Sequence, residues 1–375
     1  MEKRILLATP HMSDQGYELE YIHDAFRKNW IAPLGENVNE FEKTIARYVG
    51  GGRYPVALSA GTAALHLSMI LAGVKPGDKV FCQTLTFAAS VNPVTYLDAE
   101  PVFIDSDTET WNMDPDALER AFEIHGKPAA VVVVHLYGNP AKMDRILEIC
   151  EKHGVPLVED AAEALGSEYR GSKCGSFGRY GILSFNGNKI ITTSGGGMLL
   201  CQEEEDAYHA IKLATQARED FPWYHHEEVG FNYRLSNVSA GIGRGQAKVL
   251  PLRVEQKRAI YRRYAENLAD LPLTFQPELE ESKSNRWLTS ILLNKDCAVT
   301  PGRLLEGMLE DSIEGRHVWK PMHTQPIFRN MAYVTAGETS VSDELFARGL
   351  CLPSDTKMTM EDVDRVCRSI RRVLA

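Results

Sequence analysis

Two polar residues in the middle of the chain have the types and the spacing that carbonyl chemistry requires. Asp160 ends the apolar run VPLVED beside Glu159, and open α/β sheets bind ligands at the carboxyl ends of their strands. Lys189 lies 29 residues further on, in the polar turn of NGNKIITTSGGG. A lysine amine forms a Schiff base with an aldehyde, and a buried carboxylate keeps a pyridine nitrogen protonated. The pair predicts pyridoxal phosphate chemistry, although alone Asp160 also fits a helix cap and Lys189 a surface residue.

A second segment has the pattern of an anion-binding turn. In PVALSAGTAALHLSMILAG, residues 55–58 are expected to form a strand, 59–62 a turn and 63–71 a helix. A small-residue turn that opens a helix presents free backbone N–H groups to a phosphate. Thr62 also fits a helix cap, a role compatible with phosphate binding.

These segments require a framework of strands alternating with helices. Near-continuous apolar strands separated by amphipathic helices indicate a parallel sheet covered on both faces, which is an α/β architecture. The expected strands are 78–83, 101–106, 129–138 and 155–160, and the expected helices are 36–49, 88–99, 115–124 and 141–154.

The pattern changes after about residue 200. Residues 202–212 are expected to be helical, 215–236 to form a long loop, and 239–270 to form a helix broken at Pro251, since proline lacks the N–H that an interior helical position uses. The remainder mixes short elements and ends in a helix over 361–375. We therefore expect a PLP-binding α/β domain over 1–245 and a smaller α+β domain over 246–375.

Composition narrows the classes of function. The 375 residues carry a net charge of −10, which argues against nucleic acid or an anionic membrane as the main partner. Seven scattered cysteines without a Cys-x-x-Cys pair fit a reducing compartment. The start, MEKRILLATPHM, lacks the apolar core of a signal peptide, and no apolar run approaches a membrane span. These features predict a cytoplasmic protein, and no metal site is expected.

Six motifs occur in the order SAGTAALHL, TLTFAASVNPV, VVHLYGNPAKMD, VEDAAEALGS, SFNGNKIITTSGGGML and GFNYRLSN. Together they resemble the sugar-nucleotide aminotransferases of the DegT–StrS type, over essentially the whole chain. The resemblance implies fold-type I of the pyridoxal phosphate enzymes. It predicts a large domain with a mostly parallel, seven-stranded type of sheet flanked by helices, a smaller C-terminal domain, and a homodimer with composite active sites.

The resemblance also assigns roles residue by residue. It makes Lys189 the Schiff-base lysine, Asp160 the partner of the pyridine nitrogen, and Glu163 a neighbour of the cofactor's 3-hydroxyl. The other implied cofactor contacts are Gly61, Thr62, Ala63 and Ser184 at the phosphate, Phe87 on the ring, Asn188 beside the lysine, and Asn232 from the neighbouring subunit. Ordinary alternatives stay open: Phe87 as core, Ser184 as a turn residue, Glu163 in solvent and Asn232 bonded within its own loop.

WIAPLG, EDAAEALG, NGNKIITTSGGG, SNRWLT and WKPMHTQPIF resemble the UDP-N-acetylbacillosamine type of C4 aminotransferase. That similarity implies ping-pong transfer from L-glutamate to the C4 ketone of UDP-4-keto-6-deoxy-GlcNAc, with GDP-perosamine-type or dTDP-sugar transfer as the alternative. A diphosphate needs cationic and N–H partners. The expected substrate contacts are Trp30, Ile31, Ala32, Pro33, Arg234, Arg316, His317, Trp319, Lys320 and His323, with Tyr233 as a further apolar wall; Arg234 also fits the donor carboxylate.

Other patterns fit function less well. GIGRGQ at 241–246 lacks the last glycine and the preceding strand of a dinucleotide loop, and the adjacent His225 and His226 do not share a helix face as metal ligands do. A sugar 3-dehydrase of this fold would carry histidine where Lys189 stands. An NAD-dependent oxidoreductase would need an N-terminal glycine-rich turn, and a regulatory relative would need an added DNA-binding domain.

Overall fold

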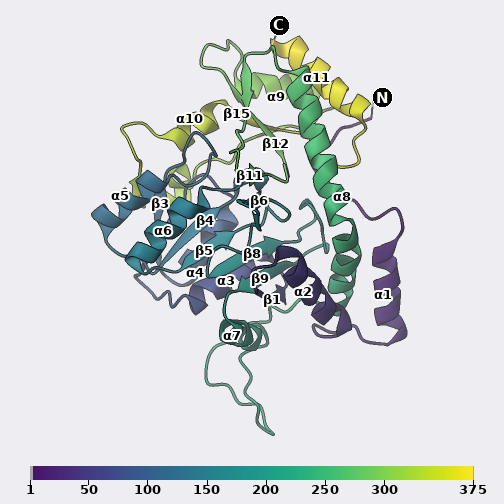
Figure 1. Ribbon diagram of the computed structural model, residues 1–375, viewed down its shortest axis with the longest axis vertical. Helices are drawn as coiled ribbons and strands as arrows, with labels where there is room; N and C mark the ends of the chain where they lie inside the picture. The colour runs from purple at the N-terminus through teal and green to yellow at the C-terminus, as the bar shows by residue number, and fades with distance from the viewer. Residues whose placement is uncertain (1–2, 375) are drawn as a thin grey trace.

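The computed structural model describes residues 3–374, and a large sheet forms its centre (Figure 1). The sheet has eight strands in the order β1-β9-β8-β5-β4-β2-β3-β14. Their bounds are β1 (Tyr54–Leu58), β2 (Lys79–Gln83), β3 (Glu100–Ile104), β4 (Ala130–Val134), β5 (Leu157–Asp160), β8 (Tyr180–Ser184), β9 (Gly197–Cys201) and β14 (Tyr333–Val334). Only β9 runs against its neighbours. The expected mostly parallel α/β sheet is confirmed, and β14 from the C-terminal part of the chain adds an eighth strand to it.

Helices cover both faces of this sheet because successive residues of a buried strand point to opposite sides. Val80 and Cys82 pack with α3, α4 and α7, whereas Phe81 packs with α5 and α6 on the other face. On that second face α2 and α8 cover the β1–β9–β8 end. The bounds are α2 (Glu36–Val49), α3 (Gly61–Leu71), α4 (Asn92–Tyr96), α5 (Pro115–His125), α6 (Met143–His153), α7 (Glu204–Ala214) and α8 (Asn237–Asn267).

Two expected helices differ from the structure at proline. The helix expected over 88–99 is divided into a short 3-10 turn, η1 (Ala88–Ser90), and α4, because Pro93 allows a helix to begin but not to continue through it. The break expected at Pro251 was wrong, since α8 continues through that residue. Buried residues on both sides of the proline, Leu250 and Val254 among them, fix α8 against the core.

A second, smaller layer lies at the end of the molecule that holds both chain termini (Figure 1). Its antiparallel sheet has the order β10-β12-β15-β13 and packs on α9, α11 and the C-terminal half of α8. The bounds are β10 (Leu273–Phe275), β12 (Thr289–Leu293), β13 (Arg316–His317), β15 (Gly349–Leu352), α9 (Pro301–Glu310), α10 (Val341–Arg348) and α11 (Met360–Leu374). Helix α11 matches the helix expected over 361–375, whose last residue lies outside the described range. The boundary expected at 245/246 falls inside α8, where the helix is uninterrupted.

The remaining elements are short. A three-stranded sheet has the order β11-β6-β7, and two 3-10 turns follow β13. Their bounds are β6 (Glu168–Tyr169), β7 (Ser172–Lys173), β11 (Ser282–Lys283), η2 (Leu136–Gly138), η3 (Met322–Thr324) and η4 (Pro326–Phe328). Helix α1 (Tyr17–Arg27) packs on the N-terminal half of α8, and the expected loop over 215–236 projects beyond α7 (Figure 1). Across residues 3–374, no helix combines the length and apolarity needed to cross a bilayer.

The glycines of GIGRGQ serve packing. This segment is part of α8, and a Cβ at Gly243 would stand 2.7 Å from the Phe41 ring while one at Gly245 would stand 2.5 Å from the backbone nitrogen of Glu18. These glycines let α1 and α2 approach α8 closely. The segment is therefore a helix contact, as its poor match to a dinucleotide loop indicated.

Candidate active site

A cavity of about 410 Å³ opens at the carboxyl ends of the central parallel strands. The residues that follow β1, β2, β5 and β8 line it, together with two tryptophans from the C-terminal part of the chain. Its lining includes Ser59, Ala60, Gly61, Thr62, Thr86, Phe87, Ser90, Asp160, Glu163, Ser184, Asn186, Asn188, Lys189, Trp287 and Trp319. Several predicted cofactor residues thus converge on one site.

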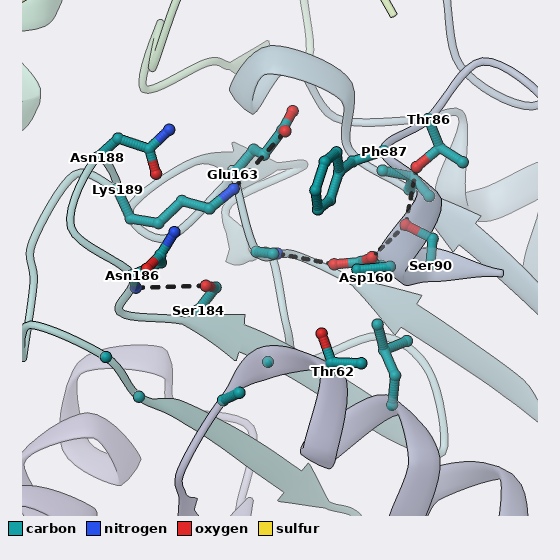
Figure 2. A pocket seen from close by; sticks show the side chains of 18 of the residues that line it. Thr62, Thr86, Phe87, Ser90, Asp160, Glu163, Ser184, Asn186, Asn188 and Lys189 are labelled. Carbon is teal, nitrogen blue, oxygen red and sulfur yellow. Dashed lines mark hydrogen bonds and ion pairs between the residues drawn. The ribbon is translucent and has the colours of Figure 1, made fainter. Parts of the chain in front are cut away.

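Lys189 reaches into this cavity from the turn between β8 and β9 (Figure 2). Its side chain is only 12% exposed, and its Nζ lies 3.7 Å from Oε1 of Glu163. The other carboxylate oxygen of Glu163 accepts the backbone N–H of Tyr137 at 2.7 Å. Burial raises the pKa of the Glu163 carboxyl, although the nearby Lys189 and the Tyr137 N–H act in the opposite direction. Glu163 therefore faces the lysine, and the solvent-facing alternative does not hold.

Asp160 ends β5 with its carboxylate at the cavity (Figure 2). Its Oδ2 accepts the Ser90 hydroxyl at 2.6 Å, and its Oδ1 accepts the backbone N–H of Ala162 at 3.1 Å. The Ser90 hydroxyl in turn lies 2.8 Å from that of Thr86. A carboxylate has about four lone-pair sites, so two remain for a ligand. Asp160 thus closes the turn after β5 and still has capacity for a protonated ring nitrogen.

The N-terminus of α3 forms another side of the cavity. The helix begins at Gly61 with Ala60 at the cap position and no capping side chain, so its first N–H groups lack a side-chain partner. Thr62 therefore is not the cap. A Cβ at Gly197 on β9 would stand 2.3 Å from the Ala60 carbonyl carbon, which shows how closely this turn lies against β9. Ser184, whose Oγ accepts the Asn186 N–H at 3.4 Å, adds a hydroxyl to this anion-binding end.

Aromatic rings form the apolar wall. The Phe87 side chain is 53% exposed and faces the cavity, so it is not a core residue (Figure 2). Its ring centroid lies 5.3 Å from that of Trp319. The indole N–H of Trp319 is buried, and its interaction with the Glu163 carboxyl acts to lower the pKa of that group. Trp319 therefore belongs to the polar network around Lys189 as well as to the apolar wall.

A second cavity of about 130 Å³ adjoins the first and shares Asn188, Trp287 and Trp319 with it. Arg316 and His317, predicted substrate contacts on β13, line this second cavity and are exposed. The guanidinium of Arg316 pairs with Glu314 at 2.9 Å. The structure therefore brings these two predicted cationic residues next to the cofactor cavity.

Other predicted contacts lie outside both cavities of their own chain. Arg234 is held by Glu42 at 2.8 Å and by the Ala57 carbonyl. His323 is bonded to Thr84 and stacked on Tyr333. Ala63 is buried in the first turn of α3, and Tyr233 is stacked on Phe231. The remaining ones are exposed or partly exposed: Trp30, Ile31, Ala32, Pro33, Asn232 and Lys320. Asn232 forms a bridge with Thr215 in the projecting loop.

Ser90, Asn186 and Trp287 are among the cavity residues that were not predicted from the sequence. Ser90 lies inside TLTFAASVNPV and Asn186 inside SFNGNKIITTSGGGML, so both motifs contained the signal. Trp287 lies in SNRWLT, but nothing in the sequence shows that this segment packs beside Lys189. Its ring centroid is 4.3 Å from Nζ of Lys189.

One buried group of potential ligands lies outside this cavity: His135, Glu159 and Cys174. Glu159 accepts hydrogen bonds from His135 Nε2 and from the N–H groups of Gly175, Phe177 and Gly178. Nδ1 of His135 accepts the backbone N–H of Ala141 at 3.1 Å, which places the proton on Nε2. The carboxylate and the imidazole are thus committed to protein partners, which gives them a structural role.

The residues around the main cavity fit pyridoxal phosphate. The cavity offers an amine for the aldehyde, a buried carboxylate for the ring nitrogen, an aromatic wall, and a helix N-terminus with a hydroxyl for the phosphate. This combination defines the class as a pyridoxal phosphate-dependent enzyme.

The comparisons with known proteins identify the family. The chain belongs to the DegT/DnrJ/EryC1/StrS aminotransferase family, whose model matches residues 13–371. The chain is 50% identical to the Bacillus subtilis protein named "Putative pyridoxal phosphate-dependent aminotransferase EpsN", over 98% of this chain and 95% of that protein. It is 35% identical to the GDP-perosamine synthase of Caulobacter vibrioides, over 99% and 98% of the two chains.

Solved structures agree with this family. DesI, solved in the presence of its TDP-sugar product, superposes with a TM-score of 0.90 at 26% identity, over 99% of this chain and 93% of DesI. The aminotransferase TlmJ from Streptoalloteichus hindustanus gives a TM-score of 0.89 at 28% identity, over 99% and 98%. The chain is therefore a pyridoxal phosphate-dependent sugar aminotransferase of fold-type I.

Proposed function

We propose that the chain transfers the amino group of L-glutamate to the C4 ketone of a UDP-linked 4-keto-6-deoxy-N-acetylhexosamine, with Lys189 as the lysine that carries the cofactor. The observation behind this proposal is the convergence of the Lys189 amine, the Asp160 carboxylate and the N-terminus of α3 on one cavity. The product, a UDP-4-amino-4,6-dideoxy sugar, is a precursor for amino-sugar glycans. The seven free cysteines fit a cytoplasmic site of action.

Each side chain has a distinct task. The pyridine ring, when bound, supplies an electron sink for the bond that is broken at the substrate carbon. Asp160 would hold the proton of the ring nitrogen, and the first N–H groups of α3 with Ser184 would hold the phosphate. Lys189, once its amine is free, takes a proton from the glutamate Cα and later delivers one to C4 of the sugar. Phe87 and Trp319 form an aromatic wall of the cavity and would help to exclude water from the reaction.

The adjoining cavity supports a large anionic substrate. Arg316 and His317 line it, and Trp319 lines both this cavity and the main cavity. These groups suit a diphosphate or the glutamate carboxylate. The second candidate is a GDP-linked 4-keto sugar, which the 35% identity to a GDP-perosamine synthase favours. One experiment should therefore compare UDP-, GDP- and dTDP-linked keto sugars as amino acceptors.

A homodimer with composite sites is part of the proposal. Asn232 and the segment 30–33 are accessible in the single chain and lie outside its own cavities. Helix α1 and the segment after it expose large apolar side chains, among them Leu19, Phe26 and Ile31. A second copy is the partner that would both cover this surface and place Asn232 at the neighbouring phosphate.

Complementation tests the composite site. Co-expressed Lys189→Ala and Asn232→Asp chains would form mixed dimers in which one site has both native residues. We expect each variant alone to be inactive or impaired and the mixture to regain activity. A monomer in solution, or no recovery in mixed dimers, would refute the dimer proposal.

Product analysis tests the reaction. The purified protein is mixed with pyridoxal phosphate, L-glutamate and UDP-4-keto-6-deoxy-GlcNAc, and the products are measured by mass spectrometry. A glutamate-dependent change from ketone to amine supports the reaction and the substrate. If the absorption band of the cofactor responds to glutamate but no amino sugar forms, the result favours a GDP- or dTDP-linked keto sugar as the substrate. A cofactor band that does not respond contradicts the proposed reaction.

A further inference from the structure

Trp287 is the aromatic residue that lies against the amine of Lys189. It precedes β12, far from Lys189 in the sequence, and is only 2% exposed. Its ring centroid lies 4.3 Å from Nζ of Lys189, inside the range of about 6 Å for a cation–π contact. Its indole N–H donates to the backbone carbonyl of Asn188 at 2.8 Å. One side chain thus contacts the reacting nitrogen and also fixes the backbone that carries it.

The amine of Lys189 lies between two groups. On one side is the Glu163 carboxylate at 3.7 Å, and on the other is the negative face of the Trp287 ring. The lysine side chain is 12% exposed, so little water is available to solvate an ammonium group. In a poorly hydrated site both contacts attract an ammonium group more strongly than they would in water, which acts against the cost of removing that charge from water.

Both partners are fixed by the same asparagine. Asn285 accepts the Trp287 backbone N–H at 2.8 Å, and its amide donates to the Glu163 carbonyl at 3.0 Å. Asn285 is fully buried. Asn285 therefore links the two backbone segments that carry the ring and the carboxylate.

A buried lysine holds the other end of Trp287. Nζ of Lys257 donates to the Trp287 carbonyl at 2.9 Å and also to the Ser354 carbonyl. Lys257 is 4% exposed, and burial lowers its pKa to about 7, with Asp355 acting in the opposite direction. Trp287 therefore forms hydrogen bonds with Lys257 on α8, with Asn285 in its own loop and with Asn188 in the Lys189 turn. These contacts hold its ring beside the amine.

We infer that Trp287 is a further catalytic residue, whose ring face holds Lys189 as the ammonium that forms when its free amine takes a proton from the substrate carbon. The inference rests on the proposed role of Lys189. The neutral amine takes a proton from the glutamate Cα and later delivers one to C4 of the sugar. A stable position for the charged amine keeps the proton in the site between these two transfers.

The test measures the chemical reactivity of Lys189 in the full chain loaded with pyridoxamine phosphate, which leaves the lysine free. Trinitrobenzenesulfonate labels neutral amines, and peptide mass spectrometry reports the labelling of Lys189 alone. We expect Trp287→Met to speed labelling by about tenfold near neutral pH, because the charged form loses its aromatic partner. Trp287→Phe, which keeps a ring face, should stay much closer to the wild type. Trp223→Leu, in the exposed loop, is the surface control.

A pH profile of labelling separates charge from access. The labelling rate of each variant rises with pH and levels off once its amine is neutral. Trp287→Met should move this rise to lower pH and leave the plateau rate unchanged. A difference confined to the plateau rate means that Trp287 only blocks the reagent, and unchanged labelling in Trp287→Met means that the ring does not hold the amine. Either result overturns the inference.

If Trp287→Met does not fold, incorporation of fluorinated tryptophan into the wild-type chain provides a second test. Fluorination weakens the negative ring face with little change in size, so labelling of Lys189 should rise stepwise with the number of fluorines. The rise should vanish in a Trp287→Phe background, where only the other tryptophans carry fluorine. A rise that persists there, or no rise in the wild type, overturns the inference.

Borohydride reduction of the pyridoxal phosphate form separately locates the cofactor on the chain. If the reduced cofactor is not attached to Lys189, the proposed function fails. If it is attached there, the labelling data test the role of Trp287 alone.

Discussion

Glu159 and Asp160 are neighbours at the end of β5, yet they lie in two chemically different regions. Glu159 is fully buried on one side of the strand and accepts four hydrogen bonds, from His135 and from three backbone N–H groups. Burial raises the pKa of its carboxyl, but the His135 bond and the N–H groups outweigh that effect, and the net pKa is lowered. Every strong acceptor position of Glu159 is used by the protein.

Asp160 points to the other side and has only two protein donors, Ser90 and the Ala162 N–H. Its neighbour in the cavity, Glu163, has a raised pKa because burial is not fully offset by Lys189. The difference is one of unused hydrogen-bonding capacity. A buried carboxylate whose acceptors are all occupied stabilises the fold, whereas one with free acceptors at a cavity is available to a ligand. Four substitutions test this distinction, in order of expected effect.

The largest effect is expected for Lys189→Ala on the cavity side. Turnover should fall by about 10⁴-fold or more, since general acid–base catalysis alone contributes on the order of 10²–10⁴ and the covalent link is lost as well. Steady-state amine formation measures the loss, and thermal unfolding should show little change. Near-normal turnover would refute the assignment of Lys189.

Asp160→Asn should impair the reaction while leaving the fold intact. The amide oxygen can still accept from Ser90 or Ala162, but without its negative charge the residue cannot hold the ring nitrogen protonated. We expect a loss of about 3–4 kcal/mol in transition-state stabilisation, the scale of a removed charge-stabilising group. Single-turnover decay of the cofactor band with glutamate gives the rate. An unchanged rate would place the ring nitrogen elsewhere.

Glu159→Gln should have the opposite profile. The free energy of unfolding should fall by about 3 kcal/mol, because an amide cannot accept from all four donors. Denaturant titration measures it, and activity per folded molecule should be retained. A catalytic defect without loss of stability would contradict the structural role of Glu159.

The pH dependence of this variant has a definite sign. Because folding lowers the pKa of Glu159, its stabilisation is present above the unfolded pKa and is lost as the pH falls through the folded pKa. The difference in stability between wild type and Glu159→Gln should therefore be largest near neutral pH and shrink below about pH 4. A difference that grows on acidification would exclude this account.

The smallest effect is expected for Ser90→Ala. Its hydroxyl bonds Oδ2 of Asp160 at 2.6 Å, and loss of a hydrogen bond to a charged group costs about 1.5 kcal/mol, or roughly tenfold in rate. Thr86→Val, one bond further from Asp160, is the matched control and should cost less. Equal effects of the two substitutions would mean that the hydroxyls act only through packing.

The sequence by itself determined the α/β class, the helices and strands with clear periodicity, and the pair Asp160 and Lys189. These features are local: apolar alternation follows from strand and helix geometry, and the two residues lie in short motifs at strand ends. The helix expected through Pro93 and the break expected at Pro251 differed from the structure, because packing decides whether a proline begins a helix or is carried through one.

Only the tertiary structure decided which distant residues meet the amine and which predicted contacts are occupied elsewhere. Trp287 reaches Lys189 because the segment before β12 packs beside the β8–β9 turn, a contact across about a hundred residues that no local pattern encodes. Arg234, predicted at the substrate, is bonded to Glu42 of its own chain. The different fates of Glu159 and Asp160 have the same origin, since a strand alone turns two adjacent carboxylates to opposite sides, and only the packed chain determines which of them finds a full set of donors.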